Sequence, residues 1–290
     1  MWIVLILGSG LFFALNHLFR KKILEDSNIL DMMILTGGAG FFFVLPLIKF
    51  VDFSIPASLL FLIMLNAAFA YGGSLLLNIA YKHCEISTIS PLLNLSPLFV
   101  ILLSYSILGE ILNSKQLLGV FFILIGGYIV TLEDIKYFIK PFTAIPKKFF
   151  VIVFATLILW SICPVINKFV LMDINTITYL FFFTMFIFFI QVGLLFSKHR
   201  FRSVTALARR KWPLLLIAGF CWVLSDLLHL ATLAIPATVV SLVIPVKRIS
   251  NLLIIIIGGT LFQEKNLIIK SSACAAMLAG LFVIGLYSRQ

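Results

Sequence analysis

Four ionisable side chains lie within apolar stretches that are long enough to cross a membrane. Asp226 and His229 share one stretch, and Lys247 and Arg248 share the next. A charge near the centre of a bilayer costs on the order of 3 kcal/mol even on the lenient insertion scale, so an intramembrane charge is expected to serve a function. With a turn near residues 235–236 and about 1.5 Å per residue, Asp226 and Lys247 both lie roughly 15 Å deep, level with each other.

The charges of these four residues do not balance. One acid cannot pair fully with Lys247 and Arg248, which stand about 100° apart on a helix. An anionic ligand would compensate the excess, because Arg248 offers a bidentate fork to carboxylate or phosphate and Lys247 a point charge. The alternative is a structural ion pair between Asp226 and one of the cations. His229 is either a proton-linked switch or a satisfied structural histidine.

The composition explains how such residues come to lie in lipid. Of the 290 residues, 62% are hydrophobic and 11% charged, and the mean hydropathy is +1.17. A soluble domain carries about 25% charged residues. In lipid every backbone N–H and C=O must be bonded within the protein, which leaves helices or a closed barrel. Apolar runs of about 20 residues without two-residue alternation favour helices. We therefore predict an all-α integral membrane protein.

Ten transmembrane helices are predicted from these runs, with short connections and no soluble domain. They cover 2–19, 29–48, 57–79, 88–108, 115–132, 149–171, 175–197, 212–234, 237–257 and 267–287. The four cysteines are far apart, so neither a metal site nor a disulfide is expected. No basic segment or small-residue cleavage site marks a signal peptide, so the first span is expected to stay in the mature protein.

Lysine and arginine are distributed unevenly between the predicted loops. The odd-numbered loops hold sixteen of them and the opposite side four. Because basic residues favour the cytoplasmic side, this places the odd loops in the cytoplasm and both termini outside, in a multi-pass protein of the plasma (inner) membrane. The net charge of +11 therefore reflects topology, and no nucleic-acid partner is expected.

The sequence contains a weak internal repeat. A shift of 154 residues sets Pro91 on Pro245, Ser96 on Ser250, Glu110 on Glu264 and Gly126 on Gly280, and a shift of 147 sets Lys21, Asp26 and Asn28 on Lys168, Asp173 and Asn175. We interpret these matches as two five-helix halves, residues 1–140 and 141–290. Because five is odd, the second half must be inverted in the membrane relative to the first.

Ten spans in two inverted halves resemble the EamA-type carriers of the drug/metabolite transporter superfamily, as do the proline that opens the fourth span of each half and the glutamate that closes it. These residues are Pro91, Pro245, Glu110 and Glu264. The resemblance implies a secondary transporter that works by alternating access around a central cavity. Carriers of this kind usually have both termini in the cytoplasm, so the resemblance and the charge count disagree, and we follow the charges.

The segment Pro245-Val246-Lys247-Arg248 resembles the Lys-Arg pair in the ninth span of plastid phosphate translocators. In those proteins the pair grips the phosphate of the substrate, and the resemblance implies the same role for Lys247 and Arg248. Asn94 is the repeat counterpart of Arg248 and could line the same cavity, as could Asn66 and Asn78. An interhelical hydrogen bond explains each asparagine equally well.

Glu110 and Glu264 are expected to cap helix ends at the membrane interface. Zincin, nucleophile-elbow and Walker-type motifs are not found in the sequence, so neither an enzyme nor ATP hydrolysis is expected. No cofactor or metal is expected.

The leading hypothesis is a secondary transporter of a small metabolite, an organic anion or phosphate compound, exchanged for a counter-substrate or coupled to protons. A general exporter of amino acids or neutral metabolites, and a flippase or accessory subunit for lipid-linked phosphates, are the alternatives. Substrate identity, transport direction and oligomeric state, including a homodimer, stay open.

Overall fold

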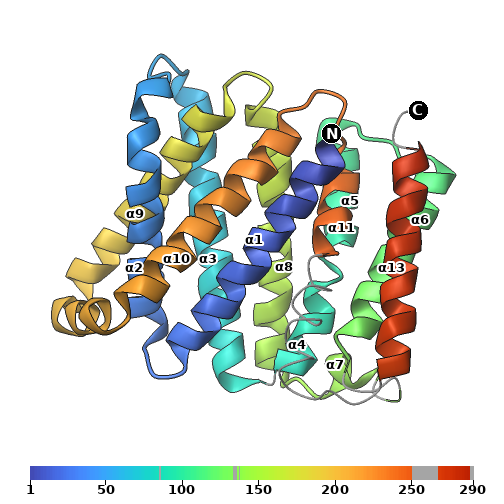
Figure 1. Ribbon diagram of the computed structural model, residues 1–290, viewed down its shortest axis with the longest axis horizontal. Helices are drawn as coiled ribbons and strands as arrows, with labels where there is room; N and C mark the ends of the chain where they lie inside the picture. Colours follow the sequence, from blue (N-terminus) through green and yellow to red (C-terminus); the bar gives the residue numbers. More distant parts are fainter. Residues whose placement is uncertain (85, 133–135, 137, 250–266, 288–290) are drawn as a thin grey trace. The chain divides into compact units, whose positions relative to one another are not determined.

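The computed structural model describes residues 1–84, 86–132, 136, 138–249 and 267–287, and their regular elements are all helices (Figure 1). In chain order these are α1 (Trp2–Leu24), α2 (Ile29–Val44), the 3-10 helix η1 (Leu45–Phe50), α3 (Ala57–His83), α4 (Ile86–Leu93), α5 (Ser96–Leu108), α6 (Ser114–Val130), α7 (Lys140–Thr143), α8 (Lys147–Val170), α9 (Thr176–Ser197), α10 (Phe201–Leu233), α11 (Val240–Arg248) and α13 (Leu267–Tyr287).

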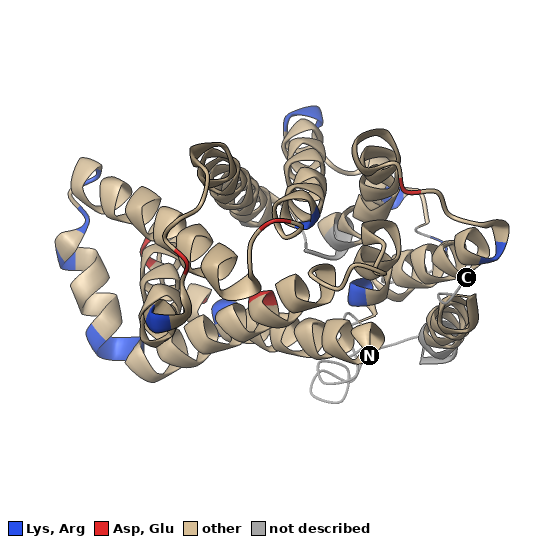
Figure 2. Cartoon of the chain, turned by 90° about the horizontal axis from the view of Figure 1, so that it is seen from above, with Lys and Arg blue, Asp and Glu red and all other residues tan. Residues whose placement is uncertain are grey.

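Seven helical segments of the described residues are long and apolar enough to cross a membrane. They are Trp2–Leu24, Ile29–Phe50, Ala57–Tyr81, Pro91–Leu108, Lys147–Val170, Thr176–Ser197 and Phe201–Leu233. Ser114–Val130 and Ser272–Tyr287 are apolar but shorter. Most of the ribbon carries neither charge type (Figure 2). The chain thus fits a multi-pass integral membrane protein, and the count of ten spans stays a prediction.

Asparagine side chains begin three of these helices. Asn28 accepts a hydrogen bond from the amide of Leu30 at the start of α2, and Asn175 accepts one from Thr178 at the start of α9. Asn113 and Gln116 form a reciprocal capping box on α6. Each cap satisfies an amide that has no partner within its helix. Asn28 and Asn175 coincide in the internal repeat, so the matched positions perform the same local task.

Prolines explain two departures from the predicted spans. Span 29–48 ends as an α-helix at Val44 and continues as η1, whose first turn contains Pro46. Span 88–108, predicted as one helix, is divided into α4 and α5. A proline lacks the N–H that continues an α-helix, and its ring clashes with the carbonyl four residues earlier. Continuous hydrophobicity does not reveal such a break.

The eighth and ninth spans also differ from their predicted limits. The helix predicted from 212 begins at Phe201 and bends at Lys211, whose backbone has φ −126° and ψ 22°. The helix predicted from 237 begins at Val240, and its regular part reaches Arg248. The rest of that predicted span, up to 257, lies outside the described residues.

The chain divides into two compact units, each built from segments of both predicted halves. Unit 1 contains Met1–Leu7, Phe69–Val165 and Ala237–Gln290, and unit 2 contains Gly8–Ala68 and Ile166–Pro236. The division falls within helices α1, α3 and α8. The two halves 1–140 and 141–290 stay a prediction.

In unit 1, α6 and α13 pack side by side with almost no space between their backbones (Figure 1). A Cβ atom on Gly280 would lie 2.5 Å from the carbonyl oxygen of Gly119, and one on Gly126 would lie 2.6 Å from that of Ala273. The contact pairs 119 with 280 and 126 with 273, so the helices are antiparallel. Glycine permits this approach because it lacks a side chain.

In unit 2, polar side chains join α1 and α8 to α10. Ser9 and Ser225 exchange hydrogen bonds through their hydroxyl groups and carbonyls, and Asn16 donates to the carbonyl of Ala218 at 2.7 Å. Lys168, which the internal repeat matches with Lys21, lies in the last turn of α8 and is buried. Its ammonium group donates to the carbonyl of Leu233 at 2.8 Å, at the C-terminal end of α10, where a cation is favoured.

Candidate functional site

The backbone is interrupted between α4 and α5, within the predicted fourth span. The amide of Asn94 bonds to the carbonyl of Pro91 at 3.2 Å, and that of Leu95 bonds to Leu92 at 3.0 Å. Pro97 stands in the first turn of α5 and cannot continue the preceding helix. Helix α5 therefore starts anew at Ser96, and no side chain caps its N-terminus. At about 1.5 Å per residue, this N-terminus lies roughly 18 Å from the end of α5 at Leu108.

Arg248 lies at this N-terminus. It is the last residue of α11, and its Nη2 donates to the hydroxyl group of Ser96 at 2.5 Å. The hydroxyl group of Ser161, on α8, donates to the carbonyl of Ser96 at 3.2 Å. Both serines are fully or almost fully buried. A guanidinium group and the positive end of a helix dipole therefore meet within unit 1, and both favour an anion.

The guanidinium group of Arg248 keeps donors to spare. It has five N–H donors, and the bond to Ser96 engages one of them. Within the described residues, no carboxylate forms an ion pair with it. The arrangement can therefore bind a carboxylate or phosphate group through the remaining donors.

Glu110 fixes the opposite end of α11. Its carboxylate accepts hydrogen bonds from the amides of Val240 and Ser241, at 2.7 and 2.9 Å, and from the hydroxyl group of Ser241 at 2.6 Å. The prediction that Glu110 caps a helix end is thus confirmed, and Glu264 lies outside the described residues. Helices α5 and α11 run antiparallel and are linked at both ends, which holds Arg248 against Ser96.

The asparagines predicted to line a cavity make hydrogen bonds within the protein. Asn94 donates to the carbonyl of Gly127 at 2.6 Å, which ties the α4–α5 interruption to α6. Asn78 donates to the carbonyl of Ser74, one turn earlier in α3, at 2.8 Å. For Asn94 the interhelical interpretation is confirmed; for Asn78 the bond shown lies within its own helix.

Asn66 belongs to a separate polar cluster in unit 2. Its amide nitrogen donates to Oδ1 of Asn167 at 2.6 Å and to the hydroxyl group of Tyr179 at 2.7 Å, and Tyr179 donates to the same Oδ1 at 2.7 Å. All three residues are buried. These bonds join α3, α8 and α9, as expected for polar groups between helices in lipid.

Asp226 and His229 lie on α10 in unit 2, whereas Lys247 and Arg248 lie on α11 in unit 1. His229 is buried, and Asp226 is partly exposed. The pairing of Asp226 with either cation joins the two units and stays a prediction. The structure therefore brings Arg248 to Ser96, and Ser161 to the carbonyl of Ser96. Neither serine is among the site residues predicted from the sequence.

Residues 1–132 match the model of the EamA-like transporter family. A solved structure described as "Crystal structure of protein" is similar in fold, with a TM-score of 0.69 and 14% sequence identity, over 99% of this chain and 97% of that chain. No curated protein matches the sequence. The similarity of fold extends over nearly the whole chain, whereas the family match covers its first part. The family match covers 132 of the 290 residues, which is less than half of the chain.

Proposed function

We propose that this protein is a secondary transporter of a small organic anion, a carboxylate or phosphate compound, and that it works by alternating access. The single observation that carries the proposal is the position of Arg248. Its guanidinium group lies at the uncapped N-terminus of α5, at membrane depth, and bonds to the hydroxyl group of Ser96.

The physical argument concerns the cost of a cation in this place. A guanidinium group in a low-dielectric environment is stabilised by charge-assisted hydrogen bonds, and a neutral serine hydroxyl supplies the weaker kind. A bound anion would supply the stronger kind and would also interact with the α5 dipole. Lys247 is adjacent in sequence and adds a second positive charge on the same helix turn. An anion would therefore gain more binding free energy at this position than a neutral solute of equal size.

The interrupted helix supports transport. Irregular backbone at membrane depth is tolerated where protein buries it or where it lines a water-filled cavity, and discontinuous helices form the substrate sites of many carriers. The match of residues 1–132 to EamA-like transporters points the same way. Coupling to a proton or a counter-substrate is part of the proposal, with His229 as the group that could take up a proton.

The experiment compares substrate classes and variants of the full chain. The purified protein is screened by thermal shift against phosphorylated metabolites, carboxylates and zwitterionic amino acids, and compounds that stabilise it are tested for uptake into proteoliposomes. Anions are expected to bind, and R248Q is expected to lose at least about tenfold in affinity because a charge-assisted bidentate contact disappears. K147Q, which removes an exposed positive charge, is the matched control.

A triple variant decides between the anion site and a structural ion pair. If Asp226 merely neutralises the cations, removing all three charges in D226N/K247Q/R248Q leaves transport largely intact. Transport that survives in this variant would refute the anion site. A general exporter of neutral metabolites would then be the better hypothesis.

A further inference from the structure

The connection between α9 and the membrane-embedded part of α10 is itself helical. Helix α9 ends at Ser197, and α10 begins at Phe201 but bends at Lys211. The ring of Pro213 cannot be accommodated next to the carbonyl of residue 209 in a straight helix, which accounts for the bend. Residues 201–210 therefore form a short helical segment with its own direction, here called the interfacial helix.

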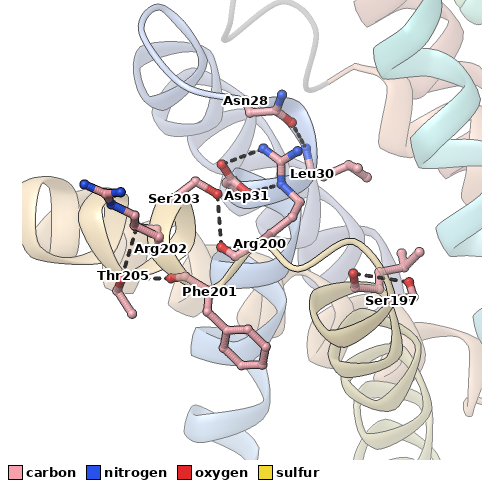
Figure 3. A network of polar contacts seen from close by, with 10 residues as sticks. Asn28, Leu30, Asp31, Ser197, Arg200, Phe201, Arg202, Ser203 and Thr205 are labelled. Carbon is pink, nitrogen blue, oxygen red and sulfur yellow. Dashed lines mark hydrogen bonds and ion pairs between the residues drawn. The ribbon is translucent and has the colours of Figure 1, made fainter.

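Ion pairs fix one end of the interfacial helix to the first turn of α2 and the other end to the connection between α1 and α2. At its start, Nε and Nη2 of Arg200 donate to the carboxylate of Asp31 at 2.5 and 2.9 Å (Figure 3). Asp31 is only 3% exposed, and its hydrogen bond raises the pKa of Arg200 above the ordinary value. At its end, Arg210 and Lys211 both bond to Asp26. The helix is therefore held in one orientation within unit 2.

The interfacial helix has one buried face and one basic face. Val204 and Leu207 are 7% and 5% exposed. Arg202 and Arg209 are exposed and seven residues apart, so they lie on one face about two turns apart, with Val204 on the opposite side. The apolar face is therefore packed within the protein, and the basic face is left on the surface.

Exposed aromatic rings flank the helix at both ends. Phe201 is 44% exposed and packs edge-on against Phe196, with ring centroids 4.9 Å apart. Trp212, at the other end, is 61% exposed. Aromatic rings of this kind gather where the hydrocarbon meets the headgroups. The chain leaves one span at Ser197 and enters the next at Trp212, so the segment has too few residues to move far from the bilayer surface.

The charge of the segment indicates which kind of lipid headgroup this surface favours. Residues 198–211 contain six basic residues and no acidic one. Arg200, Arg210 and Lys211 are engaged by Asp31 and Asp26, which leaves Lys198, Arg202 and Arg209 exposed and without an ion pair among the described residues. A basic, aromatic-flanked helix at a membrane surface is complementary to anionic headgroups.

We propose that the interfacial helix, together with Lys198 just before it, binds anionic phospholipid headgroups. Lys198, Arg202 and Arg209 contact the headgroups, and Phe201 and Trp212 are anchored among the lipids. The site is separate from Arg248 and does not depend on transport. Such a site places a preferred lipid at the N-terminal end of α10, the helix that carries Asp226 and His229.

Trp212 itself can report the binding. The full chain is reconstituted in phosphatidylcholine bilayers that contain either brominated phosphatidylcholine or brominated phosphatidylglycerol at equal mole fraction, and bromine quenches nearby tryptophan fluorescence. The contribution of Trp212 is the difference between the wild type and W212F. The anionic lipid is expected to associate at least about threefold more strongly than the neutral one, because each exposed basic residue near the surface adds to the attraction.

The variant K198Q/R202Q/R209Q is expected to reduce this preference to about one. The matched control K136Q/K147Q/K148Q removes three exposed lysines from unit 1 and should keep it. High salt should weaken it in the wild type. Equal quenching by both lipids in the wild type, or a preference that persists in the first variant, would overturn the proposal.

Discussion

Removing the carboxylate of Glu110 should destabilise the protein measurably while keeping every side chain of the proposed substrate site. The Glu110 carboxylate accepts three hydrogen bonds from Val240 and Ser241, and these cap the N-terminal end of α11. A lost N-cap costs about 0.5–2 kcal/mol, and hydrogen bonds to a charged group are worth about 1.5–3 kcal/mol each. Glu110 is half-buried, so water can replace part of what is lost. We expect E110A to lower the free energy of unfolding by about 2 kcal/mol.

Thermal unfolding of the purified protein measures this effect. For a chain of this order of size, 1 kcal/mol shifts Tm by about 2–4 °C, so E110A should melt about 4–8 °C below the wild type. S241A removes only the hydroxyl donor and should cost about 0.5–1 kcal/mol. In the double variant the two losses should not add, because the deleted hydroxyl then has no carboxylate to meet.

Glu25 supplies the control for a general effect of removing an acid. Its side chain is exposed, and E25A should change the free energy of unfolding by less than about 0.5 kcal/mol. If E110A has the same Tm as the wild type, or if the Tm of E25A falls as far as that of E110A, the cap contributes nothing and the reasoning is wrong.

Further outcomes follow from packing, topology and charge. In G280A the new methyl group would meet a backbone oxygen of α6 at 2.5 Å, so thermal unfolding should show a loss of about 1–3 kcal/mol, whereas G193A has open space and should be neutral or stabilising. A reporter fused after Gln290 should be extracytoplasmic and one within 198–211 cytoplasmic; the reverse pattern would favour the usual orientation of the superfamily. The hydrogen bond from Lys211 lowers the pKa of Asp26 below 3.8, so the stabilisation is present above that pH and is lost as the pH falls through the folded-state pKa. Hydrogen-exchange protection near the bend, corrected for the intrinsic rate at each pH, should fall as the pH drops through that pKa and stay constant at higher pH.

The sequence predicts where helices run better than which polar groups meet. Spans 149–171 and 175–197 lie within two residues of α8 and α9, because continuous hydrophobicity marks a membrane helix directly. The interruption at Asn94 was missed because its neighbours are apolar on both sides. A Ser-Pro pair at 96–97 was the available signal, since such pairs favour a new turn.

Partners across helices could not be predicted from local patterns. Asn66 was selected as a polar residue at depth, but its bond to Tyr179 joins positions 113 residues apart, and nothing in either segment specifies the other. Ser161 was not selected for the same reason. Glu110 was the exception, because a glutamate that ends one span is a residue type suited to the N-terminus of another helix.

The cap on α11 also has a consequence for the order in which the protein is made. Glu110 leaves the ribosome 130 residues before the amide of Val240 that it binds. At about 5–20 residues per second, this delay is roughly 7–26 s. Only at the end of that time, when Pro236 has been added, is unit 2 complete in sequence, and unit 1 then still lacks α11 and α13. A nascent chain that stalls after residue 236 would leave the glycine face of α6 and the carboxylate of Glu110 as recognisable marks of an unfinished protein.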